Sequence, residues 1–557
     1  MRDFVNEKFI GNSTTHRRAI YNGCGYCAHG LNKPHIGIAN AFSEMSPGHA
    51  HLRELAQSVK EGVWQEGGIP FEFGIPSTCG TVAMGTDYLS YELALRDVVA
   101  GSIELVTKIQ LFDGLIILAS CDNIIAGAMV AAARLRMPVL IITGGPMMSG
   151  RKKDGGKIML PDVDEMVFGR YAREGCPADL ALAMEEDTCP TVGACPVMGT
   201  ANTMQALSEA VGLTMPGTST IPAYVSRKKV SCQLAGKRIV HMVKEGLTAD
   251  KVLTSGMLHN GMKFSQAING STNAVMHLIS MGKELGIDIA LSEFDTISKE
   301  TPAILNISPI GPYTVDELYD YGGVPQIMKQ LESLLDTDVL LPTGKTLGEE
   351  LARVPDAPND FVRSISNPVS AEGGMAIMYG SLAPDGAVMR TTLKESITMD
   401  RKFVAHTFSS DEDAFKAIQA GEIHEGDAII LRYLGPSGAP GMVEVMQAAD
   451  ALVDFGLASK VAVITDGRFS GFNYGIIIGH VAPEASHGGN IALIHDGDLI
   501  EVNVPERKLN ICVSDEELTE RRKTLEPFEP RVKTGFMRLY DKYALPANLG
   551  AGMQDWD

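Results

Sequence analysis

The sequence predicts a two-domain α/β protein, with a parallel-sheet domain over residues 1–360 and a β-barrel-like domain over residues 361–557. A length of 557 residues exceeds what one ordinary core accommodates. The continuous apolar run at 114–119 is typical of a strand buried on both faces of a parallel sheet. After residue 360 the character changes, because short apolar runs alternate with glycine-rich turns, which is typical of a β-dominated domain.

Composition narrows the class of protein. Apolar residues make up 45% and charged residues 21%, as in a globular chain. A net charge of -20 argues against nucleic acid or an anionic membrane as the main partner, but it leaves room for a small anionic substrate. The first twenty residues carry scattered charges, and no apolar run reaches the length of a membrane span, so we expect a cytoplasmic protein.

The run at 114–119 opens a strand–helix–strand unit. Cys121 and Asp122 follow it directly, a segment with small residues suited to a helix follows at 127–135, and a second apolar run follows at 138–143. Ligands of open α/β sheets bind beyond the carboxyl ends of the strands. Cys121 and Asp122 are therefore the first candidates for chemistry.

The segments before this unit extend the same pattern. A strand is predicted at 34–40, and the helix that follows it shows apolar residues at helical spacing, at Leu52, Leu55, Val59 and Val63. His49 and His51 lie in its first turn, where the simpler interpretation is that they are exposed or cap the helix. A further strand at 69–73 leads into a loop at 77–81, and a helix near 89–105 returns the chain to the central strand.

Nine cysteines in a chain of this kind are free, catalytic or metal-binding rather than disulfide-bonded. Cys24 and Cys27 form a C-x-x-C pair without a second pair at matching spacing, which favours a structural or incidental role. Cys189 and Cys195 flank a loop rich in glycine and proline. That loop suits either the ligands of a metal cluster or a pair of buried cysteines.

The second half begins with a mainly helical region at 249–341 and a proline-rich linker at 354–367. Three short apolar runs then predict strands, at 428–431, 461–465 and 491–494. The dipeptide Asp496-Gly497 predicts a tight hairpin between the last of these and a strand at 499–502.

Two loops of this second domain carry reactive groups. The loop at 435–444 places Glu444 behind a tight glycine and proline turn, and the loop at 465–471 places Ser470 beside a glycine. A serine beside a glycine is most often a turn residue. The whole string Thr-Asp-Gly-Arg-Phe-Ser-Gly is more specific than a turn requires.

Taken together, these strings resemble the family of dihydroxy-acid and sugar-acid dehydratases over about residues 33–521. The resemblance is carried by eight segments in order, which are Gly37–Asn40, Cys121–Asp122, Thr200–Met204, Gly270–Ala274, Thr343–Glu349, Gly441–Glu444, Asp466–Gly471 and Gly479–Ala485.

The resemblance implies a site with two metal centres and a base. In such enzymes three cysteines hold an iron–sulfur cluster, of the 2Fe–2S or 4Fe–4S type, that acts as a Lewis acid beside a magnesium ion. It implies that Cys121 and Cys195 are cluster ligands, that Asp122 and Glu444 bind Mg²⁺, and that Ser470 takes the proton next to the substrate carboxylate.

The chain departs from the family pattern at three places. Gly48 stands where the family has the third cluster cysteine, Gly80-Thr81 replaces an Asp-Gly whose aspartate binds magnesium, and Asn123 replaces a metal-bridging lysine. Cys79 adjoins the lost aspartate and is our candidate for the missing thiolate. His49 is the alternative, because histidine replaces cysteine in some clusters.

We therefore expect a hydro-lyase with an altered metal site, acting on a small 2,3-dihydroxy or sugar acid, in a homodimer or homotetramer. One alternative is a cluster-free, isomerase-like enzyme that enolises its substrate with Ser470 and a divalent metal. The other is a catalytically silent paralogue that binds a ligand or partner subunits, although the intact loops at Glu444 and Ser470 speak against it.

Overall fold

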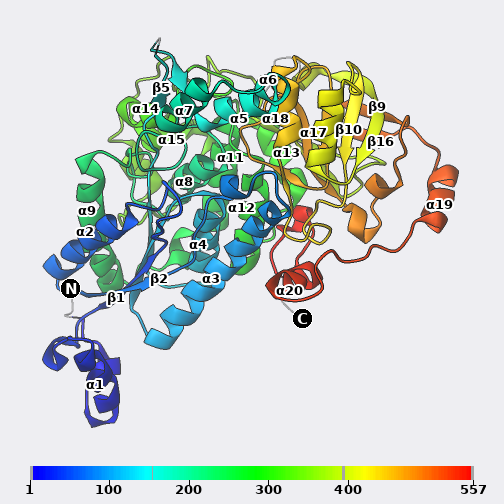
Figure 1. Cartoon of the computed structure of the whole chain (residues 1–557). Helices are drawn as coiled ribbons and strands as arrows, with labels where there is room; N and C mark the ends of the chain where they lie inside the picture. Colours follow the sequence, from blue (N-terminus) through cyan, green and yellow to red (C-terminus); the bar gives the residue numbers. More distant parts are fainter. Residues whose placement is uncertain (1–3, 154, 392–395, 554–557) are drawn as a thin grey trace.

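The computed structural model describes residues 4–153, 155–391 and 396–553. Two sheets organise these residues, one near the start of the chain and one after residue 374 (Figure 1). The first is parallel and the second is a nearly closed, barrel-like sheet of eight strands. The predicted fold class is confirmed.

The first sheet contains four parallel strands in the order β2-β1-β3-β4. Its strands are β1 (His35–Asn40), β2 (Ile69–Gly74), β3 (Gly114–Ala119) and β4 (Val139–Thr143). All six residues of β3 are buried, as its continuous apolar run predicts. The connecting helices are α2 (Leu52–Gln65), α3 (Tyr91–Gln110) and α4 (Asp122–Leu135).

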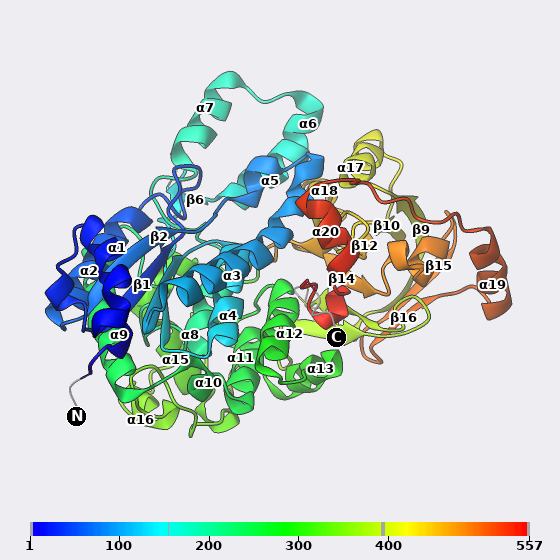
Figure 2. The ribbon, with the colours of Figure 1, turned by 90° about the horizontal axis from the view of Figure 1, so that it is seen from below.

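Helices cover this sheet and fill the region up to residue 351 (Figure 2). The longer ones are α8 (Thr200–Ala210), α9 (Ser226–Glu245), α11 (Ser255–Ala267), α12 (Asn273–Leu285) and α13 (Leu291–Glu300). The others are α1 (Thr15–Gly23), α5 (Leu160–Phe168), α6 (Arg170–Glu174), α7 (Ala178–Asp187), α10 (Ala249–Val252), α14 (Val315–Leu318), α15 (Gly323–Gln330) and α16 (Leu347–Leu351), with the short strands β5 (Gly150–Arg151) and β6 (Lys157–Ile158).

Glycines allow the helices α2 and α9 to pack closely. A Cβ atom at Gly62 would lie 2.0 Å from the carbonyl oxygen of Gln233, and one at Gly236 would lie 2.3 Å from that of Val59. Any larger residue would force the helices apart, which fixes α9 against the sheet.

The second sheet has the order β16-β15-β9-β10-β12-β14-β8-β7. Its strands are β7 (Met375–Met378), β8 (Gly386–Arg390), β9 (Asp400–Phe408), β10 (Asp427–Leu431), β12 (Ala462–Thr465), β14 (Ile476–Ala482), β15 (Leu499–Asn503) and β16 (Lys508–Ile511). A bridge between Tyr379 and Lys508 joins the two edges, so the sheet is nearly closed. Helices α17 (Asp411–Ala420), α18 (Gln447–Asp454) and α19 (Asp515–Thr524) lie outside it.

The predicted hairpin at Asp496-Gly497 is wrong. The run before it forms a 3₁₀ helix at Asn490–Leu493, and β15 instead forms its hairpin with β16. Ile491 and Ile494 are fully buried, so a buried turn satisfies the apolar pattern as well as a strand does. Asp496 accepts a hydrogen bond from the backbone N–H of Thr407 at 2.7 Å, which ties the turn to β9.

The end of the chain returns to the first domain. Helix α20 (Phe536–Tyr543) contacts α3, and the 3₁₀ turn Ala547–Leu549 contacts α12 (Figure 2). The returning segment therefore packs on both α3 and α12, which belong to the first half of the chain. Among the described residues, no helix combines the length and the apolar character that crossing a membrane requires.

Candidate active site

A cavity of about 120 Å³ brings the predicted site residues of both domains together. The residues in question all line it, namely Cys79, Cys121, Asp122, Cys195, Glu444 and Ser470. Asp122 begins α4 just beyond the carboxyl end of β3, as the strand pattern predicts. Glu444 lies in the short strand β11 (Glu444–Val445), and Ser470 directly follows β13 (Arg468–Phe469).

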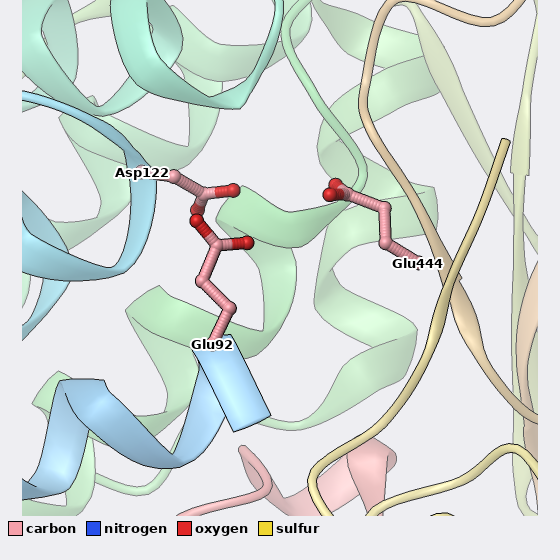
Figure 3. A group of neighbouring side chains, drawn as sticks. All are labelled: Glu92, Asp122 and Glu444. Atoms are coloured by element: carbon pink, nitrogen blue, oxygen red, sulfur yellow. The ribbon is translucent and has the colours of Figure 1, made fainter. Parts of the chain in front are cut away.

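Three carboxylates converge at this cavity. One ligand oxygen each from Glu92, Asp122 and Glu444 lies within 4.8 Å of the others, and Figure 3 shows the three groups pointing toward one another. Glu92 was not predicted. It lies in the first turn of α3, where an acidic residue is common at a helix start, so its sequence context gives no functional signal.

The guanidinium of Arg468 lies among the same carboxylates. Its nitrogens approach Glu92 at 3.2 Å, Glu444 at 3.3 Å and Asp122 at 3.4 Å, and its side chain is fully buried. Parallel pairing of β11 with β13 places Glu444 opposite Arg468 and creates this contact. Three ionised carboxylates with one guanidinium leave two negative charges uncompensated.

Burial raises the pKa of every acid in this group. It raises that of Glu444 to about 8 and, with the neighbouring Asp122, that of Glu92 to about 7. Burial also raises the pKa of Asp122. Arg468 opposes these shifts in all three residues, because its positive charge favours the ionised carboxylates.

Cys79, Cys121 and Cys195 surround the other part of the cavity. Burial, followed by the neighbouring thiols, raises the pKa of Cys121 and Cys195, and burial raises that of Cys79. In the part of the chain that the structure describes, their sulfur atoms do not form a group within 4.8 Å of one another. Cys24, Cys27 and Cys189 are exposed and lie outside this lining, so the interpretation of Cys189 as half of a buried pair is wrong.

The packing around Cys121 leaves no room for a side chain at position 48. A Cβ atom at position 48 would lie 2.7 Å from the Cys121 sulfur and 3.2 Å from the Ser120 hydroxyl oxygen. Cys121 thus fills the space that a side chain at position 48 would need. Ser46 Oγ lies 4.0 Å from the same sulfur atom.

The two histidines before α2 are buried, so the interpretation that they are exposed or cap the helix is wrong. His51 Nε2 lies 2.9 Å from the carbonyl oxygen of Gly144. His49 Nδ1 lies 3.2 Å from Ser46 Oγ, and its buried Nε2 has no hydrogen-bond partner among the residues that the structure describes. His49 lies outside the lining of the cavity.

Ser470 is held by its own loop. Its hydroxyl donates to Asn473 Oδ1 at 2.9 Å, and the backbone N–H of Phe472 donates to Ser470 Oγ at 3.3 Å. Asn473 in turn donates to Asp450, which lines the cavity together with Asp164. Burial raises the pKa of both of these aspartates, that of Asp164 to about 7, so this wall of the cavity is acidic.

The donor sets fit two different kinds of metal. Three clustered carboxylates with two uncompensated charges suit a hard divalent cation such as Mg²⁺. Three thiols around one cavity are the soft donors that iron–sulfur clusters use.

Comparison with known proteins identifies the family of this chain. The family profile "Dihydroxy-acid/6-phosphogluconate dehydratase N-terminal" matches residues 33–350, and its C-terminal counterpart matches residues 360–551. A dihydroxy-acid dehydratase of Ignicoccus hospitalis is 42% identical over 96% of this chain and 97% of its own length. One from Pyrococcus abyssi is 41% identical over 99% of both chains. The chain therefore belongs to the dihydroxy-acid/6-phosphogluconate dehydratase family and is a dehydratase, a lyase of carbon–oxygen bonds.

Proposed function

We propose that this dehydratase removes water from a small 2,3-dihydroxy or sugar acid, giving a 2-oxo acid, with an altered metal site. The observation that carries the proposal is the shared cavity, in which carboxylates, thiols and the Ser470 hydroxyl from distant parts of the chain face one another. The relatives from Ignicoccus hospitalis, Carboxydothermus hydrogenoformans and Pyrococcus abyssi are named dihydroxy-acid dehydratases, which favours a 2,3-dihydroxy acid over a longer sugar acid.

In this proposal, Asp122 and Glu444 hold Mg²⁺, and Glu92 joins them in place of the lost aspartate. The ion, when bound, stabilises the substrate carboxylate and the negative charge that develops beside it. Arg468 supplies a positive charge at the same carboxylates, which favours their ionised forms against the effect of burial. Asn123 adds no charge where the family has a lysine.

Cys79, Cys121 and Cys195 hold the iron–sulfur cluster, with Cys79 replacing the thiolate lost at Gly48. The cluster, when bound, acts as a Lewis acid on the hydroxyl that leaves. The thiols must lose their protons to bind iron, and their raised pKa values mean that metal binding and deprotonation occur together.

Ser470 Oγ takes the proton from C2 of the substrate. The N–H of Phe472 already points at this oxygen and stabilises negative charge on it. Ser470 reacts as the alkoxide, after its own proton has passed to solvent. The C3 hydroxyl leaves as hydroxide and takes up the proton removed from C2, which releases water and restores the alkoxide, and the resulting enol becomes the 2-oxo acid. To act as a base, Ser470 must give up its hydrogen bond to Asn473.

The second candidate is the cluster-free enolising enzyme. It is favoured by Gly48, which leaves position 48 without the thiolate that the family has there. Anaerobic purification followed by iron and sulfide assay distinguishes the two. A parent protein without iron or sulfide after reconstitution excludes the cluster, and a full cluster in Cys79→Ser protein would transfer the third ligand to His49 or to the Cys24 and Cys27 pair.

The reaction itself is tested by incubating the reconstituted protein with 2,3-dihydroxy acids and sugar acids and measuring 2-oxo acid. Absence of product from every member of both classes would favour the silent paralogue. The homodimer or homotetramer stays a prediction, which sedimentation velocity tests.

A further inference from the structure

His277 of α12 lies between a buried arginine and the Asp122 carboxylate. Its Nδ1 atom is 3.3 Å from Arg96 Nη1, and its Nε2 atom is 3.9 Å from Asp122 Oδ1. The His277 side chain is buried, and neither Nε2 nor Asp122 Oδ1 has a hydrogen-bond partner among the described residues. The two unpartnered atoms face each other.

The contact with Arg96 decides which ring nitrogen of His277 carries the proton. A guanidinium has only donors, so the Nδ1 atom beside it must accept. The proton of the neutral ring is therefore on Nε2, the atom that faces Asp122. His277 can donate to Asp122 Oδ1 once these two atoms close from 3.9 Å to hydrogen-bond distance, while Arg468 contacts the other oxygen, Oδ2, at 3.4 Å.

Arg96 is in turn fixed by the end of the chain. Its Nη1 donates to the carbonyl oxygen of Gly550 at 2.9 Å, and its Nη2 donates to that of Ala551 at 2.8 Å. The Tyr540 hydroxyl of α20 donates to the same Ala551 carbonyl at 2.6 Å. Asp97 contacts Arg96 at 3.3 Å, and the Arg96 side chain is fully buried.

We propose that His277 and Arg96 are positioning residues that aim the Asp122 carboxylate at Glu92 and Glu444, so that the C-terminal tail, residues 536–553, is part of the metal site. The inference rests on the proposed role of Asp122. Histidines and carboxylates that orient a metal ligand by a hydrogen bond change metal affinity by about 10–100-fold when they are removed. In the usual arrangement a carboxylate orients a histidine that binds the metal, whereas here His277 orients a carboxylate that binds the metal.

The test is the affinity of the purified full-length protein for Mn²⁺, measured from the electron paramagnetic resonance signal of the free ion. His277→Leu removes the donor and should weaken binding by about 10–100-fold. His277→Gln places an amide N–H at a similar reach and should keep most of the affinity. His35→Leu removes another buried histidine, in β1 and outside the cavity lining, and should leave the affinity unchanged.

Arg96→Met should also weaken Mn²⁺ binding, and the double variant with His277→Leu should bind no more weakly than His277→Leu alone, because both act through one contact. Parent-like affinity in His277→Leu, where Asp122→Asn abolishes binding, overturns this inference alone. If Asp122→Asn binds Mn²⁺ as tightly as the parent, both the inference and the proposed metal site are overturned. If His277→Leu does not fold, parent-like affinity in folded Arg96→Met protein overturns the inference instead.

Discussion

Replacing Arg468 by methionine should destabilise the protein in a way that depends on pH. An acid whose folded pKa is raised costs stability as pH rises from its unfolded pKa to its folded pKa, and then costs no more. In the parent this loss of stability stops growing near the folded pKa of each acid, at about pH 7 for Glu92 and about pH 8 for Glu444. Without the guanidinium both pKa values rise further, so the cost continues to grow.

The size follows from the pKa values. One pKa unit corresponds to about 1.4 kcal/mol, so between pH 6 and pH 9 the variant should lose up to about 4 kcal/mol more than the parent, from two further pH units of loss at Glu92 and one at Glu444. That value agrees with the roughly 3–5 kcal/mol lost when one partner of a buried ion pair is removed. The measurement is urea unfolding followed by circular dichroism at several pH values, in EDTA so that no cation replaces the missing charge.

Two variants serve as controls. Arg390→Met removes a buried arginine whose hydrogen bonds within the described part of the chain go to the carbonyl oxygens of Gly471 and Asn269, so its cost should not depend on pH in this range. Arg468→Lys retains a positive charge and should restore most of the parent's pH profile. A cost of Arg468→Met that is equal at pH 6 and pH 9 would refute the reasoning.

Three further predictions concern the base, the cation and a buried histidine. Ser470→Ala should lower kcat by about 10³-fold or more in a 2-oxo acid assay, with folding intact, and near-parent turnover would remove Ser470 from the mechanism. Saturating Mn²⁺ should raise the unfolding free energy of the parent by about 2.7 kcal/mol at a hundredfold excess over Kd, but not that of Asp122→Asn or Glu444→Gln; equal stabilisation of all three would contradict the site. His35, whose pKa burial lowers to about 4, should weaken the packing of Phe9 and Tyr21 as pH falls from 6.5 toward 4, by up to about 3 kcal/mol. Hydrogen exchange of residues 5–31 should show this loss in the parent and not in His35→Phe.

The sequence predicts those parts of the fold that local pattern determines. The buried strand β3, the helix α2 and the placement of Asp122 beyond a strand end all follow from residue spacing. The hairpin at Asp496-Gly497 fails because a short apolar run is compatible with any buried conformation. Tertiary contacts, here the hydrogen bond from Thr407 to Asp496, decide whether such a run forms a strand or a buried turn.

The candidate site is only partly visible in the sequence. The proximity of Asp122 and Glu444 is expected from the family resemblance, whereas Glu92 and Arg468 join them through the folding of α3 and the pairing of β11 with β13. The burial of His49 is equally a product of tertiary packing, since its sequence neighbours are polar or small. Such contacts between distant segments leave no periodic signal along the chain.

The contact of the C-terminal tail with Arg96 has a consequence for biosynthesis. A ribosome delivers the first sheet, with β3 and α4, hundreds of residues before it delivers Gly550 and Ala551. Until then Arg96 lacks both carbonyl acceptors and retains only its contacts with Asp97 and His277 among those described above, so its guanidinium is incompletely hydrogen-bonded. We therefore expect a nascent chain that ends before residue 536 to keep this region open to solvent and to proteases, and metal loading to follow release of the complete chain.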